Sequence, residues 1–373
     1  MAGNRTKLKI IDLFAGVGGI STGFKKAGFD VISANEYDSE IANTYKKNHP
    51  GTKIIINDIS NIKSKDLLNG EKMIDVIVGG PPCQGFSMAG RRIRKKGIFI
   101  NDPRNELFKE FIRVVKDIKP KVFVLENVAA MLNIHKGAIK KEIIEEFKKI
   151  GYNTQVHVLL AADYGVPQLR KRAVFIGNRL GIDPELFFPK KTHGYKEQKD
   201  YTTIEEAIFD LPNLSSGSGE FESKYTSIKN LTSYQKERRG KNKKLFNHQS
   251  TEHKPEIIEI LKKIKEGEGR SSLPSSLQTK SVHSGAFGRL NRNKPAYTIT
   301  TRFDTPSVGR VTHPIQHRAL TPREAARIQS FDDSFVFYGS KSSIGKQIGN
   351  AVPPLLAQSI ALQILKILKK YDK

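Results

Sequence analysis

The chain's 373 residues suffice for two domains, or for one large domain with an insertion, and they can bury a sizeable core. The formal net charge of +25 makes nucleic acid the first partner to consider, although a lysine-rich surface that only keeps a protein soluble is also common. The single cysteine excludes an internal disulfide, and the apolar run near the N-terminus is too short for a signal peptide or a membrane span, so we expect a soluble cytoplasmic protein.

Short apolar runs alternate with longer helical patterns through the first half of the chain. The expected strands are Leu8–Phe14, Val31–Ala34, Ile54–Asn57, Asp75–Val78, Val122–Leu125, Gln155–Leu160 and Ala173–Gly177. The expected helices between them are Ile20–Ala27, Ser39–Asn48, Asn105–Ile118 and Lys136–Ile150. This alternation predicts an α/β fold with a mostly parallel sheet that helices cover on both faces.

The composition changes from about Leu180 onward. Ser, Asn, Lys and Gly become frequent, and no further βαβ unit can be recognised. Helical patterns return at Pro322–Ser330 and Pro354–Lys369. We therefore predict a first domain over residues 1–189, a second, smaller domain inserted over residues 190–338, and a C-terminal segment, residues 339–373, that returns to the first domain.

A glycine-rich turn follows the first expected strand. Gly16, Gly18 and Gly19 allow a tight turn in which a ligand can approach the backbone at a helix N-terminus. Glu36 follows the second strand, where a carboxylate can bind ribose hydroxyls, and Asp58 follows the third, where it can accept a bond from an adenine amino group. Taken alone, each acid is better explained as a helix N-cap or a turn residue. Together they favour an adenosine-containing cofactor, without distinguishing NAD from S-adenosylmethionine.

The only cysteine lies in a loop that follows the fourth strand and reads GGPPCQGFS. A lone cysteine is more often a small buried apolar residue than a nucleophile. Here two prolines precede Cys83 and a glycine follows closely, so the backbone is fixed at the ligand edge of the sheet, which a thiol that only fills core space does not need. We therefore predict that Cys83 is a nucleophile, with the thiolate as its reactive form.

Polar residues also end or precede the next strands. Glu126 and Asn127 end a strand at the same edge, where a carboxyl group can bind or protonate a heterocycle nitrogen. A helix N-cap explains Glu126 equally well. Arg170 and Arg172 fall on one side of an extended segment and could fix a base oxygen and a phosphate, or form a solvated strand edge.

In order and spacing, these segments resemble the motifs of the bacterial-type DNA (cytosine-5) methyltransferases. The matching segments are DLFAGVGG, Glu36, Asp58, GGPPCQGFS, LENV, QLRKR, LTPREAARIQSF and IGNAVPP. They cover about Leu8–Gly177 and Pro306–Lys369, and GGPPCQGFS and IGNAVPP are the most specific of them. The resemblance implies a Rossmann-like, class I S-adenosylmethionine-dependent methyltransferase sheet, with the catalytic and cofactor-binding domain interrupted by a target-recognition domain.

The resemblance also implies a reaction. A methyl group would pass from S-adenosyl-L-methionine to C5 of a cytosine taken out of the DNA duplex, giving S-adenosyl-L-homocysteine, with no metal. Cys83 would attack C6, Glu126 would contact N3 and the exocyclic amine, and Arg172 would hold the base oxygen. Arg170 would lie nearby and support the loop or a phosphate. The residues implied for the cofactor pocket are Phe14, Gly16, Gly18, Gly19, Glu36, Tyr37, Asp58, Ile59, Pro81, Asn350 and Val352.

DNA contacts are implied for the loop after the cysteine and for the insertion. The loop residues are Gln84, Ser87, Arg91, Arg92 and Arg94, which singly are also explained as a solvated charge run. In the insertion we expect phosphate contacts from Lys236, Arg238, Arg239, Lys241, Lys243 and Lys244. Arg323 is expected to organise the domain through internal bonds. The implied partners of the expected monomer are double-stranded DNA and, by resemblance alone, a restriction endonuclease that acts on the same site.

Other functions share parts of the pattern. An NAD-dependent dehydrogenase would explain the glycines and Glu36, but not the PPC loop, the charge or the C-terminal return. A tRNA cytosine methyltransferase on this scaffold typically carries a Cys-Phe-Thr element in the insertion, and another RNA methyltransferase group uses two cysteines; a single cysteine excludes both patterns. A non-catalytic relative would be expected to lack Cys83 or Glu126, and both are present.

Overall fold

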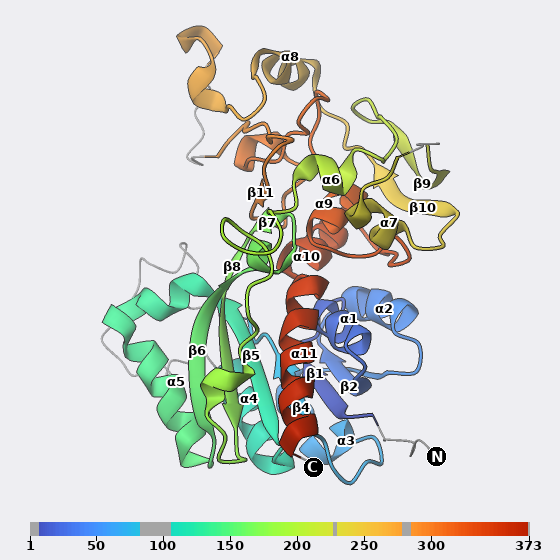
Figure 1. The fold of residues 1–373 in the computed structure, drawn as a ribbon. Helices are drawn as coiled ribbons and strands as arrows, with labels where there is room; N and C mark the ends of the chain where they lie inside the picture. The colour runs from blue at the N-terminus through green and yellow to red at the C-terminus, as the bar shows by residue number, and fades with distance from the viewer. Residues whose placement is uncertain (1–6, 83–105, 227–229, 278–284, 372–373) are drawn as a thin grey trace. The chain divides into compact units, whose positions relative to one another are not determined.

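The structure is a computed structural model that describes residues 7–82, 106–226, 230–277 and 285–371 (Figure 1). The chain forms two compact units. The first comprises Met1–Leu160, Lys171–Lys190 and Leu356–Lys373, and the second comprises Ala161–Arg170 and Lys191–Leu355. The second unit thus begins one residue after the predicted boundary at 190, ends beyond the predicted 338, and also takes in a short segment from the first half of the chain. The assignment of catalytic and target-recognition roles to these parts stays a prediction.

The first unit is built on a seven-stranded sheet with the order β3-β2-β1-β4-β5-β8-β6. Its strands are β1 (Lys9–Leu13), β2 (Asp30–Glu36), β3 (Lys53–Ile56), β4 (Val76–Gly79), β5 (Val122–Val128), β6 (Asn153–Leu160) and β8 (Lys171–Asn178). Neighbouring strands pair in parallel except around β8, which is antiparallel to both β5 and β6. Each predicted strand overlaps one of these, so the predicted mostly parallel α/β fold is confirmed.

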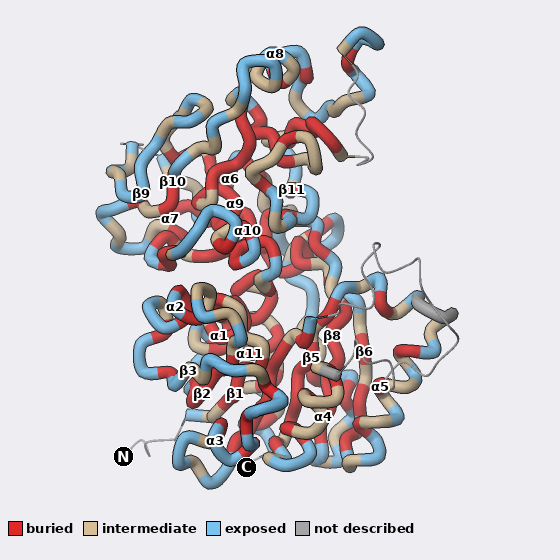
Figure 2. Tube along the Cα trace, turned by 180° about the vertical axis from the view of Figure 1, so that it is seen from behind, coloured by how far each residue is buried: buried red, intermediate tan, exposed pale blue. Residues whose placement is uncertain are grey.

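The predicted helices of the first unit are present close to their predicted positions. They are α1 (Gly19–Lys26), α2 (Ser39–Asn48), α4 (Glu106–Ile118), α5 (Ala138–Lys149) and, at the C-terminus, α11 (Pro354–Tyr371). The short α3 (Ser64–Leu67) was not predicted. In Figure 1, α11 runs in front of β1 and β4, whereas α4 and α5 pack against the sheet through one apolar cluster. The strands β1, β2, β4, β5 and β8 are buried along most of their length (Figure 2), because helices shield them from water.

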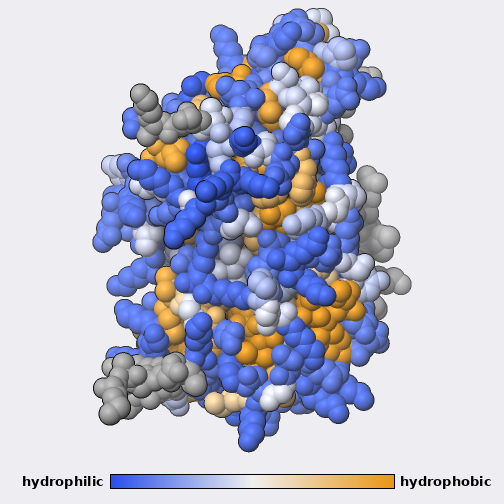
Figure 3. All heavy atoms as spheres, turned by 90° about the vertical axis from the view of Figure 1, so that its right-hand side faces the viewer, coloured by the Kyte–Doolittle hydropathy of each residue, from blue (hydrophilic) through white to orange (hydrophobic). Residues whose placement is uncertain are grey.

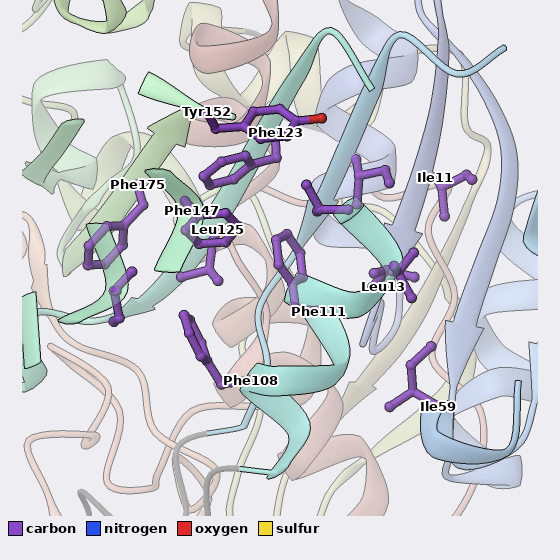
Figure 4. Close-up of a cluster of buried hydrophobic side chains, with 14 of the residues drawn as sticks. Ile11, Leu13, Ile59, Phe108, Phe111, Phe123, Leu125, Phe147, Tyr152 and Phe175 are labelled. Atoms are coloured by element: carbon purple, nitrogen blue, oxygen red, sulfur yellow. The ribbon is translucent and has the colours of Figure 1, made fainter. Parts of the chain in front are cut away.

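Aromatic rings fill the core between the sheet, α4 and α5 (Figure 4). Phe123 of β5 stacks on Phe147 of α5 with ring centroids 3.8 Å apart, and Phe111 of α4 meets both rings edge-on. Gly177 of β8 leaves the space that the Phe123 ring occupies, since a Cβ at this position would lie 2.2 Å from Phe123 Cε1. The alignment of β8 beside β5 therefore depends on the absence of a side chain at residue 177.

The second unit has little regular sheet. It contains two small strand pairs, β9 (Gly219–Lys224) with β10 (Lys244–Gln249) and β7 (Gln168–Leu169) with β11 (Ala296–Tyr297). Its helices are α6 (Ile204–Ile208), α7 (Ser233–Arg239), α8 (Pro255–Lys263), α9 (Pro322–Ile328) and α10 (Lys341–Asn350). Of these helices, the sequence analysis expected only α9. The others are short or carry mixed sequences without a clear apolar stripe.

Buried arginines hold this second unit together. Arg323 is fully buried and donates to the backbone carbonyls of Phe246, Asp332 and Phe335 at 2.9, 3.1 and 2.7 Å, which confirms its predicted organising role. Arg327 donates to Asp333 at 2.6 Å and to Asp210 at 3.1 Å, and all three side chains are inaccessible to water. Paired charges of this kind are strongly destabilising to break, because one partner is left buried and uncompensated.

The predicted phosphate contacts of the insertion need correction at two positions. Arg238 is buried and donates to the Ser330 carbonyl at 2.9 Å and to Asp332 at 2.9 Å. Arg239 donates to Asp210 at 2.7 Å and lies 4.1 Å above the Tyr225 ring. The spacing in the sequence could not show this, because these bonds come from segments far along the chain. For the exposed Lys236, Lys241 and Lys243, phosphate contact stays a prediction.

The surface in Figure 3 is mainly hydrophilic, as expected from the many charged residues in the sequence. On the face in Figure 3, hydrophilic residues predominate and hydrophobic residues form smaller patches between them. Residues 341–371 are long and apolar enough by composition to cross a membrane. Half of their most apolar stretch of 18 residues is buried inside the structure, and the core helix of a soluble protein can have the same length and composition.

The contact between Gly177 and Phe123 leads to a stability prediction. The substitution Gly177→Ala should destabilise the chain by about 1–3 kcal/mol, because the added methyl group forces Phe123 out of its packed position. Urea unfolding followed by circular dichroism measures the effect. In a Phe123→Leu background the same substitution should cost clearly less, since the smaller side chain leaves room. An equal cost in both backgrounds would show that the ring does not impose the constraint.

Candidate active site

The carboxyl ends of the parallel strands bring the predicted residues of the first unit to one edge of the sheet. Phe14 follows β1, Glu36 ends β2, Asp58 follows β3, Pro81 follows β4, and Glu126 lies near the end of β5. Open α/β sheets bind their ligands at this edge. Because β8 runs the opposite way, its first residues, including Arg172, reach the same edge.

The glycine-rich turn uses its glycines for different purposes. Phe14, Gly16 and Gly18 have φ values of 55°, 56° and 88°, in the left-handed region. At Gly18 a Cβ would lie 2.3 Å from His49 Nε2, so this glycine lets the turn pack on the end of α2. At Gly16 a Cβ would meet no atom of the described residues within 4 Å, so they leave open space beside this backbone. Gly19 begins α1 and is buried. The turn is therefore packed at Gly18 and accessible at Gly16.

Glu36 ties this turn to the end of β2. Its Oε2 accepts a hydrogen bond from the Gly16 amide at 2.9 Å, and its Oε1 accepts one from the Asp38 amide at 2.9 Å. Burial raises the pKa of Glu36, and these two bonds oppose the rise. The N-cap of α2 is Asp38, which accepts from the amides of Glu40 and Ile41. The alternative explanation of Glu36 as a helix cap is thus wrong.

Asp58 is a helix N-cap, as the alternative explanation from the sequence predicted. It caps the single turn Ile59–Asn61 by accepting bonds from the Ser60 amide at 2.9 Å and the Ser60 hydroxyl at 2.7 Å, which lower the pKa of Asp58. The following Ile59 is buried, whereas Tyr37, next to Glu36, is 74% exposed. A capping bond leaves further lone pairs on the carboxylate, so an adenine contact by Asp58 stays a prediction.

An ion pair joins β5 to β8. Arg172 Nε lies 2.6 Å from Glu126 Oε1, and both side chains are only 13% exposed. A Cβ on Gly80 would lie 3.0 Å from Glu126 Oε2, so the loop after β4 passes directly beside the carboxylate. A pair this sheltered is screened little by water and holds both groups in a fixed orientation.

The start of the cysteine loop is anchored by Asn127. Its Nδ2 donates to the Pro81 carbonyl at 3.1 Å, and its Oδ1 accepts from the Val128 amide at 2.8 Å. The sequence analysis placed Asn127 at this edge without giving it a function. Cys83 follows two residues after Pro81 and lies outside the described residues, as do Gln84, Ser87, Arg91, Arg92 and Arg94.

The remaining predicted residues belong to the second unit. Arg170 is buried and donates to the carbonyls of Ile299 at 3.0 Å and Gly349 at 2.9 Å. These bonds favour the supporting role suggested for Arg170 over direct contact with a base. Asn350 ends α10 and is exposed, and Val352 is buried. Their closing of the cofactor pocket stays a prediction.

A buried polar network beneath the glycine-rich turn was missed by the sequence analysis. Asp12 in β1 is fully buried, and its Oδ2 accepts bonds from the Ser21 hydroxyl at 2.6 Å and the Ser21 amide at 3.2 Å. The same hydroxyl lies 2.8 Å from Tyr45 Oη. Asp12 Oδ1 has no hydrogen-bond partner among the described residues, and burial raises the pKa of Asp12 to about 7. Asp12 follows two isoleucines and precedes a leucine in the strand KIIDL, and an acid among these apolar residues was the signal that could have revealed the network.

A family model described as C-5 cytosine-specific DNA methylase matches residues 8–366. The chain belongs to this family. The match spans the glycine-rich turn, the cysteine loop, the Glu126–Arg172 pair and the whole of the second unit. The resemblance inferred from the sequence motifs is therefore confirmed.

Named relatives of this methylase are similar over nearly their full lengths. The Type II methyltransferase M1.HphI of Haemophilus parahaemolyticus is 40% identical over 362 residues, which cover 96% of this chain and 87% of the relative. The Type II methyltransferase M.DdeI of Desulfomicrobium norvegicum is 37% identical over 380 residues, covering 96% and 88% of the two chains.

Solved structures agree with the fold of this methylase. A putative DNA modification methyltransferase encoded within an E. coli prophage superimposes with a TM-score of 0.78 at 28% identity, covering 97% of this chain and all of that one. The S. pombe Dnmt2 methyltransferase superimposes with a TM-score of 0.61 at 16% identity, covering 97% of this chain and 99% of that one, and shows a shared fold alone.

The Asp12 network predicts a pH dependence of stability. Because burial favours the neutral carboxyl group, Asp12 stabilises the fold most at acidic pH, and this contribution is lost as the pH rises towards the pKa of about 7. The substitution Asp12→Asn removes the titrating group. The difference in unfolding free energy between wild type and variant should therefore shift in favour of the variant between pH 5 and pH 8.

Urea unfolding at several pH values tests this prediction. Glu36 and Tyr45 also face Asp12 and are present in both proteins, so their own titration cancels to a first approximation. A difference that stays constant across this range would show that Asp12 does not change its charge there.

Proposed function

We propose that this methylase transfers a methyl group from S-adenosyl-L-methionine to C5 of a flipped-out cytosine in a specific duplex DNA sequence, as the modification enzyme of a restriction–modification system or as an orphan methylase. Membership of the family establishes cytosine-5 DNA methylation. The Type II relatives support the modification role. The observation that carries the proposed mechanism is the sheltered Glu126–Arg172 pair beside the start of the cysteine loop.

The pair is suited to holding a cytosine ring. Arg172 holds one oxygen of Glu126, and in the described part of the chain the other oxygen, Oε2, accepts no hydrogen bond and lies beside Gly80. Cytosine presents an exocyclic amine and N3 on one edge and O2 next to them. We assign the amine and N3 to Glu126 and O2 to Arg172, because an acid and a neighbouring guanidinium match this order of groups.

Cys83 supplies the covalent step. Cytosine C5 is a poor nucleophile, but addition of the cysteine thiolate to C6 forms a C–S bond and moves electron density to C5. A carboxyl group at N3 favours this addition by neutralising the charge that develops on the ring. After C5 is methylated, loss of the C5 proton to a base and breaking of the C–S bond restore the aromatic ring and release Cys83. A base must leave the stack for C6 to be reached, which explains the need for base flipping.

The glycine-rich turn fits the cofactor. S-adenosyl-L-methionine, when bound, supplies an electrophilic methyl group. The open space at Gly16 admits a ligand against the backbone, Glu36 can accept bonds from ribose hydroxyls, and the exposed Tyr37 ring lies next to Glu36. The set proposed from the first unit also includes Phe14, Gly18, Gly19, Asp58, Ile59 and Pro81. From the second unit we propose Asn350 and Val352.

The proposed partners follow from this activity. Duplex DNA is the substrate, and a cognate endonuclease that cuts the same unmodified sequence is the expected companion of a modification enzyme. We infer a monomer that acts in the cytoplasm, where bacterial DNA lies.

Two active-site substitutions test the mechanism. With tritium-labelled S-adenosylmethionine, wild type should label duplex DNA and leave tRNA unlabelled. Cys83→Ser should abolish both methyl transfer and the covalent complex with 5-fluorocytosine DNA. Glu126→Gln should lower kcat by about a hundredfold or more, because the group that supports the developing charge is lost.

A surface substitution provides the matched control. Glu146→Gln makes the same chemical change in the ion pair that Glu146 forms with Lys149 on α5, and it should leave the rate unchanged. Trapping by Cys83→Ser would show that another group is the nucleophile. Labelling of tRNA but of no DNA across varied sequences would overturn the proposed substrate. Bisulfite sequencing of DNA from cells that express the protein then gives the target sequence.

A further inference from the structure

Arg310, which is half-buried, forms a cation–π pair with the exposed Tyr297 on the second unit. The guanidinium carbon of Arg310 lies 4.7 Å from the centroid of the Tyr297 ring, and Tyr297 is 51% exposed. We propose that Arg310, held on this ring, recognises a guanine of the target sequence through its O6 and N7 atoms. The inference rests on the proposed function and adds a residue that selects the DNA sequence.

The stem of Arg310 lies in a slot made by glycines. A Cβ on Gly288 would lie 2.3 Å from Arg310 Cγ, and a Cβ on Gly285 would lie 3.3 Å from the same atom. The backbones are joined as well, since the Thr312 amide donates to the Gly288 carbonyl at 3.1 Å and the Leu290 amide to the Thr312 carbonyl at 3.0 Å. The backbone therefore confines the stem of the Arg310 side chain.

The support beneath this slot is rigid. Arg289 is buried and donates to the carbonyls of Ile264 at 2.7 Å, His313 at 2.8 Å and Gln316 at 2.9 Å. Its neighbour Phe287 packs in a small apolar core with Leu261 and Ile264 of the α8 region. A side chain that recognises a base must be positioned to within about half an ångström. The buried hydrogen bonds of Arg289 hold the neighbouring backbone in place with that precision.

Tyr297 is anchored from the other side. It lies in β11, which pairs in parallel with β7, and the hydroxyl of the next residue, Thr298, donates to the Leu169 carbonyl at 3.1 Å. Along the chain, Leu169 precedes Arg172 by three residues. The ring on which Arg310 rests is therefore fixed to the same short segment that continues into the base-binding arginine.

Within the described part of the chain, no acid neutralises the charge of Arg310. Most arginines of the second unit are bound by acids: Arg239 by Asp210 at 2.7 Å, Arg292 by Glu266 at 3.0 Å and Arg318 by Glu324 at 2.7 Å. Among the described residues, Arg310 forms no hydrogen bond or ion pair. A cation that is held in place yet left without an acid is suited to an external acceptor.

The geometry favours a base over a phosphate. The contact with the ring restricts the movement of the guanidinium group, and no acceptor among the described residues binds its N–H groups, which suits two parallel bonds to guanine O6 and N7. Phosphate contacts position DNA without reading it, and a flexible lysine supplies them equally well. Neither the glycine slot nor the aromatic support is needed for a contact of that kind.

Sequence discrimination tests the proposal. After the wild-type target is mapped by bisulfite sequencing, kcat/KM is measured on that duplex and on duplexes in which each guanine is replaced in turn. For Arg310→Ala and Arg310→Lys, the preference for guanine should fall by roughly ten- to a hundredfold at one position and stay unchanged at the others. Lysine should not rescue the preference, because it lacks the planar fork. Tyr297→Phe keeps the ring and should behave as wild type.

Lys294→Ala is the matched control, since it removes one exposed positive charge from the same unit and should leave every preference unchanged. Thermal unfolding of all variants checks that the fold is intact. An equal loss of kcat/KM on all duplexes, restored by lysine, would identify a phosphate contact and overturn the proposal, as would unchanged discrimination in Arg310→Ala. If wild type methylates no duplex at all, the proposed function fails instead, before the role of Arg310 arises.

Discussion

The Glu126–Arg172 ion pair depends on one reversal of strand direction. Strands β1, β4 and β5 run in parallel, so their carboxyl ends deliver the glycine-rich turn, the cysteine loop and Glu126 to the same edge. If the strand beside β5 ran parallel to it, the last residues of that strand would lie at this edge. Because β8 is antiparallel, it brings its first residues instead, and the register that sets Val128 opposite Arg172 lets the guanidinium reach Glu126. The packing of Phe123 over Gly177 fixes that register from within the core.

The two units achieve stability in different ways. The first has a large apolar core of the kind expected for an α/β sheet, with aromatic rings between the sheet and its helices. The second relies on buried arginines that bond to backbone carbonyls and to Asp210, Glu324 and Asp333. Carbonyls in irregular loops need donors once they are buried, and one guanidinium can satisfy several of them. This allows irregular backbone to be held rigidly, as the proposed reading of DNA requires.

Glycines and polar anchors make the candidate site precise. Gly18 allows α2 to pack closely against the turn, Gly16 leaves the turn open, and Gly80 lets the cysteine loop pass beside Glu126. Asn127 then fixes the carbonyl of Pro81. The two close approaches and the Asn127 bond position the groups to which we assign the chemistry, and Gly16 leaves room for a ligand. Such support is worth a large part of a rate enhancement, because misplacement by about 1 Å can cost a hundredfold.

The sequence by itself determined the sheet, most of its helices and the family, because apolar periodicity is local and the motifs lie on consecutive strand ends. It also predicted that Cys83, Glu126 and Arg172 carry the chemistry, because they stand in segments that match the family's motifs. The tertiary structure decided what depends on contacts between distant segments: that Glu36 ties the turn rather than capping a helix, that Arg170, Arg238 and Arg239 are bound internally, and that Asp12 lies in a buried network. A run of basic residues looks the same whether its charges meet water, phosphate or a buried carboxylate. Only packing separates these cases, because the partner comes from elsewhere in the chain.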